Sequence, residues 1–372
     1  MANPIERLSN LGYGAMIPEV TPGVALTPNV FIKYYKNTLN LNVNLDEDNP
    51  VAGVRSNPFN QYPGMRSYEG ALDVLAEPNN AEHFFNMLLA AGSITGGSDP
   101  YTHPFTEGLS ASYTMEFQKG QIVERYFGVQ AEDIESAWNK NKMQFNINVS
   151  ALGSFIVGQI ATVATTTITL DTTKDPSPTK GLVAGDLVRV MKSDGSSTLD
   201  TTIAVAGVNA DGITLTLGAS AAAFAAGDFI FLRAQTPSYV DLTPFMWART
   251  QFQFGTSASA ALSAAQLRLE TGSKWKITHK FNKKQGEDRS GSFDPASLAR
   301  LQTEAELTLK MFFDQPQKLM NYLNIASTSA LVIKHFSGSN HELRVTFNQL
   351  RYKMDKRDIE SAKLVYEEIT GR

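Results

Sequence analysis

The two ends of this chain repeat the same order of structural signals, and that repetition limits the folds open to it. Residues 39–45 alternate Leu or Val with Asn, and residues 274–281 alternate Lys or Thr with Trp, Ile, His or Phe. Apolar side chains at every second position are typical of a strand with one buried face. A long polar loop follows each strand, at 46–65 and at 282–300. Each half therefore opens with a strand and a long loop.

The next elements of the two halves also correspond. We predict strands over 68–75 and 303–312, and a short helix after each of them. Asn79, with Glu82 three residues later, is expected to cap the first helix, and Asp314 the second, since a side-chain oxygen there accepts an unpaired backbone N–H. The apolar helix faces are expected to consist of Phe84, Phe85, Leu88 and Leu89 in the first half and Leu319, Met320 and Leu323 in the second.

Two further strands follow each helix. They are predicted at 110–117 and 121–129, and at 330–336 and 342–350. The tetrapeptide Asp-Ile-Glu-Ser then occurs at 133–136 and again at 358–361, each time ahead of a last strand. We interpret the ordered agreement as one β-sandwich-plus-helix fold present twice. The alternative is a chance similarity of two β domains.

Residues 155–236 differ in composition from both flanks. They contain no Glu, His, Trp or Tyr, and short β-branched runs alternate with turn signals. This pattern is typical of a small antiparallel barrel or sandwich. The segment is weakly doubled, because a Gly-Asp pair precedes a strand at 185–186 and again at 227–228. We expect these pairs to be turn residues rather than metal ligands.

The predicted fold class is mainly β with short helices. A first sandwich copy with an N-terminal leader occupies 1–154, an inserted β module on the outer surface occupies 155–236, and a second copy occupies 237–372. Two or three domains agree with a length of 372 residues.

Composition excludes several classes of protein. The chain has no cysteine, so it has neither a disulfide framework nor a thiolate metal site. No stretch approaches the ~18 apolar residues of a membrane-spanning helix, and membrane insertion is not expected. The first residues, 1–7, lack the basic-then-apolar pattern of a signal peptide. We expect a protein that is made and used without export.

Charge is distributed unevenly along the chain. The formal net charge is −7 over 1–154, −2 over 155–236 and +5 over 237–372. Unlike surfaces at the two ends of one chain favour head-to-tail association. The alternative is that both halves are simply well solvated.

The usual local signatures of catalysis are missing. The chain has no nucleophile elbow, phosphate-binding glycine loop, dinucleotide fingerprint or zinc-protease helix motif. His335 and His341 flank a short turn, and we interpret them as polar residues beside a hairpin rather than a metal site. We therefore expect no catalytic residues, no cofactor and no metal, although a sandwich can carry many chemistries.

Two charged runs are candidate binding sites. The lysines of 274–284 could follow a phosphate backbone, but no aromatic residues interleave to stack bases, so tight DNA binding is not expected. The acidic run 46–48 lacks the spacing of a calcium loop. A contact with an oppositely charged protein surface is the preferred interpretation of both.

Several segments of the sequence resemble those of a known family. The stretch 63–74, the Phe-rich helix with Leu-Ala-Ala-Gly at 89–92, His-Pro-Phe at 103–105, and Tyr-Phe-Gly-Val-Gln at 126–130 resemble the tail tube (major tail) proteins of long-tailed bacteriophages. The leader from Leu-Gly-Tyr-Gly at 11–14 to Pro-Asn-Val-Phe at 28–31 is similar as well.

This resemblance implies a structural virion protein whose subunits close into rings. The rings stack into a hollow tube, and genome DNA passes through it without tight binding. Tape-measure, tail-completion and tail-tip proteins are the implied further partners, and the implied place is the virion tail, assembled in the host cytoplasm. Relatives with one fold per chain form rings of six, so a chain with two copies needs only three subunits; six is the alternative.

The candidate contacts between subunits or rings lie in the two long loops, whose charges are partly complementary. They are Asp46, Glu47, Asp48, Arg55, Lys283, Lys284, Glu287, Asp288 and Arg289. Two other functions stay open on sequence alone. One is a carbohydrate- or surface-binding β protein that uses the inserted module, which lacks an aromatic platform. The other is a hydrolase with a dispersed site.

Overall fold

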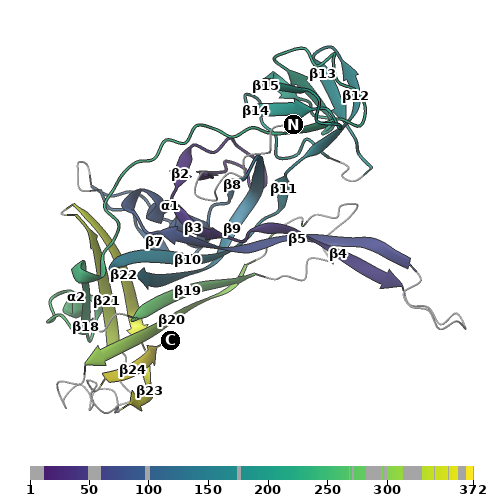
Figure 1. Cartoon of the computed structure of the whole chain (residues 1–372). Helices are drawn as coiled ribbons and strands as arrows, with labels where there is room; N and C mark the ends of the chain where they lie inside the picture. The colour runs from purple at the N-terminus through teal and green to yellow at the C-terminus, as the bar shows by residue number, and fades with distance from the viewer. Residues whose placement is uncertain are drawn as a thin grey trace, which may run out of the picture.

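Long antiparallel strands carry the fold, because their alternating side chains bury apolar residues on one face or on both. The computed structural model describes residues 12–48, 60–96, 101–173, 177–267, 269, 272–281, 295, 298, 300–312, 329–338, 340–350, 352–358 and 366–371. These residues form three parts, which are a first sandwich, a small barrel and a second set of sheets (Figure 1).

The first part contains ten strands and a helix. They are β1 (Gly14–Pro18), β2 (Val30–Ile32), β3 (Tyr34–Asn37), β4 (Asn40–Asp48), β5 (Asn60–Leu75), α1 (Pro78–Leu88), β6 (Ala90–Ala91), β7 (Phe105–Thr106), β8 (Tyr113–Lys119), β9 (Ile122–Asn139) and β10 (Lys142–Ser150). One sheet has the order β2-β1-β8-β9 and the other the order β4-β5-β10-β9. The long strand β9 serves both sheets, so its two halves tie the sandwich together.

The inserted segment is a closed six-stranded barrel. After β11 (Gly153–Phe155) come β12 (Gly158–Ala164), β13 (Thr167–Leu170), β14 (Leu187–Met191), β15 (Thr198–Val208), β16 (Thr214–Leu217) and β17 (Phe229–Leu232). Each strand pairs with two neighbours, in the order β12-β13-β16-β15-β14-β17 and back to β12. Closure leaves no free edge. The expected small β module is confirmed as a barrel, which forms a lobe of its own in Figure 1.

The second part repeats the strand pairing of the first. Its elements are η2 (Trp247–Arg249), β18 (Thr250–Gly255), α2 (Ala258–Leu262), β19 (Lys274–Phe281), β20 (Arg300–Phe312), β21 (Ser329–Ser337), β22 (His341–Leu350), β23 (Tyr352–Asp358) and β24 (Tyr366–Gly371). One sheet has the order β18-β21-β22 and the other the order β19-β20-β24-β23. Each of these five pairings has a counterpart among β1, β8, β4, β5, β10 and β9 of the first part.

The two outer parts share one hydrophobic core, and the barrel has a second. The shared core joins residues of α1 and β10 to residues of β19, β20 and β21. Trp275 of β19 packs against Phe85 of α1 and Phe145 of β10, at ring-centroid distances of 5.9 and 6.2 Å. The barrel core contains Val123 of β9, so the barrel is packed onto the first sandwich at its base.

The structure corrects the predicted cap of the first helix. The helix begins at Pro78, and its N-cap is Glu77 rather than Asn79. The Glu77 N–H donates to Asn80 Oδ1 at 3.0 Å. Proline favours the first helical position because its fixed φ suits the helix. Glu82 instead bonds His103, at 2.9 Å. Phe84, Phe85 and Leu88 of the first helix are buried, as expected. The residues of the expected second helix lie outside the described residues.

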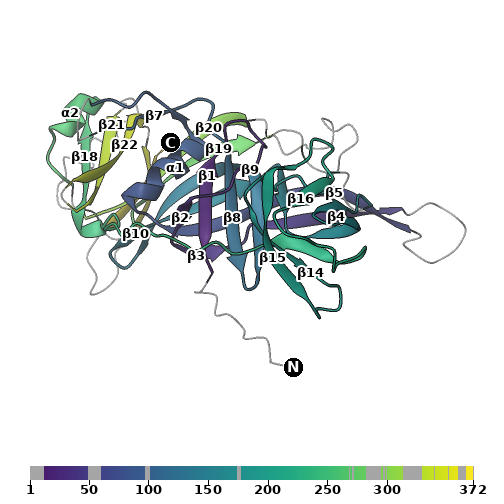
Figure 2. The same cartoon turned by 90° about the horizontal axis from the view of Figure 1, so that it is seen from above.

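The first long loop is shorter than predicted. β4 continues to Asp48 and β5 begins at Asn60, so residues 46–48 and 60–65 of the predicted loop 46–65 form the outer part of a two-stranded ladder. Figures 1 and 2 show this hairpin projecting from the body as an arm. The polar sequence of this segment predicted a loop. Two polar strands can nevertheless pair, because the backbone N–H and C=O groups of each strand form hydrogen bonds with those of the other.

Candidate subunit interface

The two outer parts are joined edge to edge by a pairing of β9 with β19. Ile277 lies opposite Ile134, Lys276 opposite Glu135 and Thr278 opposite Asp133, in antiparallel register. The order β4-β5-β10-β9 therefore continues into β19-β20-β24-β23 as one sheet of eight strands. We call the β9–β19 pairing the in-chain junction.

Side chains reinforce the in-chain junction on both sides of the backbone ladder. Lys274 Nζ lies 2.5 Å from Glu135 Oε1, and Lys276 Nζ lies 2.9 Å from Asp133 Oδ2. The N–H of Trp275 donates to Ser136 Oγ at 2.9 Å. Diagonal pairs of opposite charge contribute ~0.2–1 kcal/mol each across neighbouring strands. All four residues of the first Asp-Ile-Glu-Ser tetrapeptide thus belong to this junction.

A buried histidine stands behind the junction. His335 of β21 is fully buried, and the Trp275 indole N–H donates to its Nε2 at 3.1 Å. Because Nε2 accepts, the neutral ring carries its proton on Nδ1, which donates to Thr250 Oγ1 at 3.0 Å. Burial lowers the pKa of His335 to about 3, so the ring is neutral at ordinary pH. His335 lies in the hairpin of β21 and β22, as expected, but its side chain is buried in the core.

Two tryptophan rings pack against this histidine, and a third packs against one of them. Trp138 and Trp275 lie 5.7 and 6.4 Å from the His335 ring, and Trp247 lies 4.9 Å from Trp138. Trp138 also donates to the backbone oxygen of Ser273, at 3.0 Å. Because Trp138 comes from β9 and Trp275 from β19, these contacts hold the two outer parts together. We call these four residues the tryptophan cluster.

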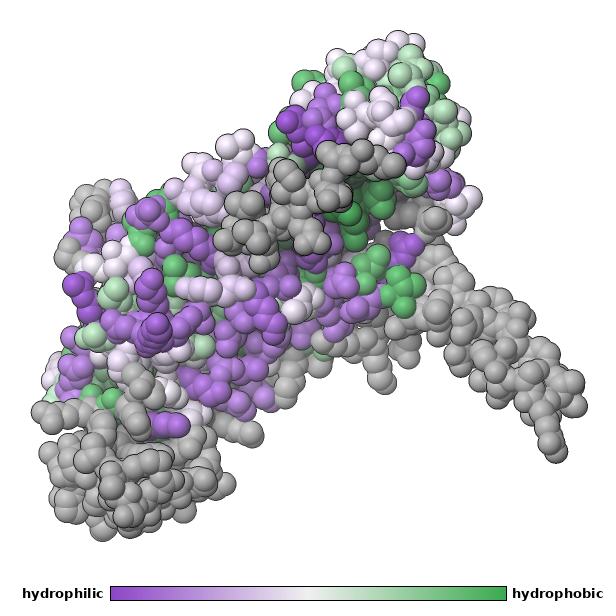
Figure 3. All heavy atoms as spheres, viewed as in Figure 1, coloured by the Kyte–Doolittle hydropathy of each residue, from purple (hydrophilic) through white to green (hydrophobic). Residues whose placement is uncertain are grey.

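The eight-stranded sheet ends in two strands that each have one partner among the described residues. β4 pairs with β5, and β23 pairs with β24. The outer edge of each strand carries backbone N–H and C=O groups available for a further strand. On the face seen in Figure 3, hydrophilic residues predominate over the body and hydrophobic residues form small separate patches. Pairing at strand edges suits such a surface better than packing of apolar faces.

A buried ion network fixes the barrel on the first sandwich. Arg125 of β9 is 1% exposed, and its guanidinium contacts Glu116 of β8 at 2.8 Å and Asp186 of the barrel at 2.5 Å. It also donates to the backbone oxygen of Gly181 at 3.1 Å. Burial alone would lower the pKa of Arg125, but Asp186 and Glu116 raise it above its ordinary value.

The carboxylates of this network have further donors. Tyr13 donates its hydroxyl to Glu116, Gln235 donates to the same oxygen, and Thr27 donates to Asp186 at 2.7 Å. A buried charge is tolerated when it is paired and its remaining lone pairs are satisfied. The network therefore sets the orientation of the barrel, with contributions from the interior and the C-terminal end of the inserted segment and from the N-terminal strand region.

The Gly-Asp pairs of the barrel are turn residues, as expected. Asp186 accepts from the Val183 N–H at 2.7 Å, and Asp228 accepts from the Ala225 N–H at 2.9 Å. Both carboxylates close a four-residue turn, over 183–186 and 225–228, which explains the internal doubling. No group of three or more metal-binding side chains occurs among the described residues.

The candidate contact residues from the sequence are placed only in part. Asp46, Glu47 and Asp48 occupy the outer end of β4, opposite Tyr62, Gln61 and Asn60 of β5. Arg55, Lys283, Lys284, Glu287, Asp288 and Arg289 lie outside the described residues. The complementarity of the two charged segments stays a prediction.

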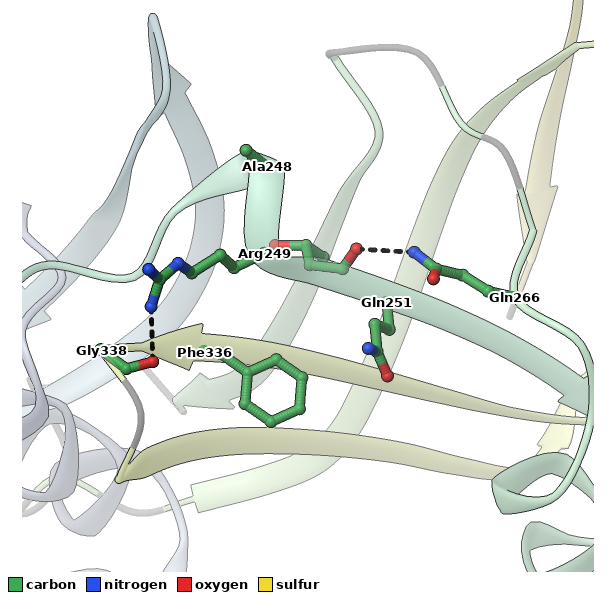
Figure 4. Close-up of a pocket in the computed structure, with 7 residues that line it drawn as sticks. Ala248, Arg249, Gln251, Gln266, Phe336 and Gly338 are labelled. Atoms are coloured by element: carbon green, nitrogen blue, oxygen red, sulfur yellow. Dashed lines mark hydrogen bonds between the residues drawn. The ribbon is translucent and has the colours of Figure 1, made fainter.

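A shallow hollow lies beside η2 and the turn between β21 and β22 (Figure 4). Arg249 lines it and donates to the backbone oxygen of Gly338 at 2.6 Å, and Gln266 donates to the backbone oxygen of Thr250 at 3.2 Å. The lining is completed by Ala248, Gln251 and Phe336. The Arg249 guanidinium is thus hydrogen-bonded to the chain's own backbone. The residues that line the hollow include no carboxylate and no histidine.

Comparison with known proteins places the chain in a family. The family model described as phage tail tube protein matches residues 8–248, which include the first sandwich and the barrel. The chain belongs to the phage tail tube protein family. It is therefore a structural component of a phage tail. No curated protein matches the chain.

The model of the tail tube family ends near η2, so the second part of the chain rests on its own evidence. That evidence is the repeated strand pairing and the in-chain junction.

Sequence reasoning missed the Arg125 network and the tryptophan cluster, whose members are far apart in the chain. A charged residue within an apolar strand, such as Glu116 in Tyr-Thr-Met-Glu-Phe, was the available signal. Among the described helices, none is long and apolar enough to cross a membrane.

Proposed function

We propose that this chain self-assembles into rings that stack into the hollow tail tube, and that genome DNA passes through the tube. The observation that carries the proposal is the eight-stranded sheet, whose two outermost strands, β4 and β23, each have one partner among the residues that the structure describes. A ring forms when the last strand of one chain pairs with the first strand of the next, which satisfies both edges. Membership of the tail tube family supports the same assembly.

The repeated pairing supports two copies of the tube fold in one chain, over 1–154 and 237–372, with the barrel of 155–236 on the outside of the tube. A ring of three chains then presents six equivalent copies. Six chains per ring is the alternative. Stacking is a heterologous contact that repeats without closing, as a tube requires. The arm formed by β4 and β5 is long enough to reach beyond the body of one subunit (Figure 2).

The proposal includes no enzymatic activity and no cofactor. Tape-measure, tail-completion and tail-tip proteins are the further partners we propose, and assembly takes place in the host cytoplasm. A tube that conducts DNA must not hold it tightly, so we expect a neutral or acidic lumen.

Negative-stain electron microscopy of the purified chain tests this function. Tubes or rings with three outer projections are expected, one for each barrel. Six projections would mean one chain for each sixfold position, and would overturn the ring of three. Small particles at every concentration and ionic strength would contradict self-assembly and would favour a binding protein that uses its barrel.

A further inference from the structure

The sheet β18-β21-β22 of the second part has one face in the shared core and one face turned outward. The core face consists of one residue from each strand and its neighbours, namely Phe252, Ile333 and Val345. Successive side chains of a strand point to opposite faces, so the next residue of each strand points outward. Gln251, Lys334 and Arg344 lie opposite one another and form a row across this outward face.

Cations predominate on the outward face. Lys334 is half-buried and has no ion pair among the described residues, and the Arg344 side chain is 48% exposed. Arg249 lies beside the same strands, at the hollow that Phe336 also lines (Figure 4). Glu342, opposite Phe336, accepts from Arg344 Nε at 2.7 Å, so one carboxylate accompanies three cations. We call Arg249, Lys334 and Arg344, with Phe336, the cationic face.

The helix α2 covers the neighbouring row of this sheet and leaves the cationic face open. Val332 lies in that neighbouring row, opposite Gln253, and is fully buried. Gln253 donates to the backbone oxygen of Ala264, just beyond α2, at 2.9 Å. In the next outward row, Gln251 and Lys334 are half-buried and Arg344 is exposed. Among the described residues, the chain therefore covers one row of the outward face and not the next.

The corresponding sheet of the first part, β2-β1-β8-β9, shows which chemistry covers such a face. Its outward side carries Arg125 of β9, and Lys33 directly follows β2. The barrel places Asp186 on Arg125 at 2.5 Å, and the segment after the barrel places Asp241 on Lys33 at 2.6 Å. Each of these two cations thus receives a carboxylate from the segment that covers it, as a charge-assisted hydrogen bond.

We propose that the cationic face binds an acidic segment of another protein. The carboxylates of that segment pair with Lys334 and Arg344, and an apolar side chain of it packs on Phe336. Opposed residues of paired strands have Cβ atoms ~4.5–5.5 Å apart, so the two cations suit carboxylates at alternate positions of an extended segment. Arginine also offers two parallel N–H donors to one carboxylate, which favours this partner chemistry.

The position of the cationic face favours a protein partner over nucleic acid. The sheets β18-β21-β22 and β2-β1-β8-β9 both pack on the shared core, so their outward faces turn away from the eight-stranded sheet. With the barrels outside the tube, the cationic face lies outside as well, away from the path of the DNA; this step rests on the proposed function. Tight binding of a duplex commonly uses about six to ten phosphate contacts, more than three cations supply.

Fluorescence anisotropy tests this binding with a fluorescein-labelled peptide in which Glu alternates with Ser around one central Leu. We expect the wild-type chain to bind the peptide at low salt and to bind it more weakly as salt screens the charges. Lys334→Gln with Arg344→Gln should raise the Kd at least about tenfold, because two charge-assisted contacts are lost. Arg344→Gln alone changes an exposed side chain, and it should give a smaller loss if the double variant does not fold.

Three controls accompany the measurement. Lys180→Gln with Lys192→Gln removes two positive charges from the barrel and should leave the Kd unchanged. A peptide with Gln in place of every Glu should not bind. A short labelled DNA duplex should bind the chain more weakly than the acidic peptide.

The outcomes separate this inference from the tube function. No binding of the acidic peptide at low salt, or equal losses in the two double variants, would overturn the proposal. Tighter binding of the duplex at Lys334 and Arg344 would assign the face to nucleic acid instead. Peptide binding by the unassembled chain that is lost in rings would place the face between copies, and would overturn an outside partner. Rings without peptide binding leave the tube function standing, whereas a wild-type chain that forms no rings contradicts the tube function itself.

Discussion

Arg125 is a side chain on which two parts of the molecule depend. It supplies the positive charge between a carboxylate of the first sandwich and a carboxylate of the barrel. Replacing a buried ion pair by apolar residues is often tolerated, but removing one partner leaves an uncompensated buried charge. The contribution of this network to the free energy of unfolding is therefore measured by removing one of its members.

The substitution Arg125→Met tests the contribution of the network to stability. We expect the free energy of unfolding to fall by about 3–5 kcal/mol, because Glu116 and Asp186 lose their shared partner. Chemical denaturation followed by circular dichroism measures the change. Arg189→Met is the matched control, since Arg189 pairs with Asp200 on the barrel surface, where about a third of each side chain is exposed. It should cost at most about 1 kcal/mol. Equal effects of the two variants would contradict the role of the buried network.

His335 predicts a particular dependence of stability on pH. Its pKa is lowered from 6.5 to about 3 by burial, so the folded chain resists protonation that the unfolded chain accepts. The stabilising contribution is complete above about pH 6.5 and is lost progressively as the pH falls toward 3. Urea unfolding at a series of pH values measures it.

His335→Gln should be less stable than wild type at pH 8, and its stability should fall less steeply between pH 6.5 and 3. His341→Gln is the control, because His341 is exposed at the start of β22 and should leave the profile unchanged. A wild-type slope in His335→Gln would show that other groups govern the acid response.

Among the elements, the alternating strands could be predicted and their partners could not. Residues 40–45 and 274–281 lie in strands, as their alternation of apolar and polar side chains predicted. The hairpin arm was not predicted, because the outer residues of β4 and β5 are polar and show no alternation. These two strand ends are held together by hydrogen bonds between their backbones. Gly70 illustrates another hidden constraint, because a Cβ there would meet the Leu39 backbone at 2.3 Å.

The candidate interface was predictable at the level of the fold and not at the level of residues. The repeated order of elements indicated two copies, whereas the loop charges indicated contacts through the loops and did not indicate the strand edges. An edge is a property of pairing between segments more than a hundred residues apart, such as β9 and β19. The tetrapeptide at 133–136 did mark the in-chain junction.

For the whole molecule, the uneven charge predicts how rings stack. The acidic residues at the outer end of β4 and the basic residues Lys283 and Lys284 belong to regions of opposite net charge. Lys283→Glu with Lys284→Glu should shorten tubes or leave single rings, because like charges then face each other between rings. Tube length in electron micrographs at low and high salt measures the effect.

A charge-matched control separates local contact from net charge. Lys180→Glu with Lys192→Glu makes the same change in net charge on the barrel and should leave tube length unaltered. Tubes of normal length from the Lys283 and Lys284 variant would contradict the role of this segment in stacking. Equal shortening by both variants would point to overall repulsion instead.

The tryptophan cluster turns the chain into its own optical probe. All three tryptophans of the protein lie in it, and residues 155–236 contain neither tryptophan nor tyrosine. Emission excited at the red edge of tryptophan absorption therefore comes from one place, the seam between the two outer parts. Opening of that seam would be seen without any label, while melting of the barrel alone would pass unnoticed.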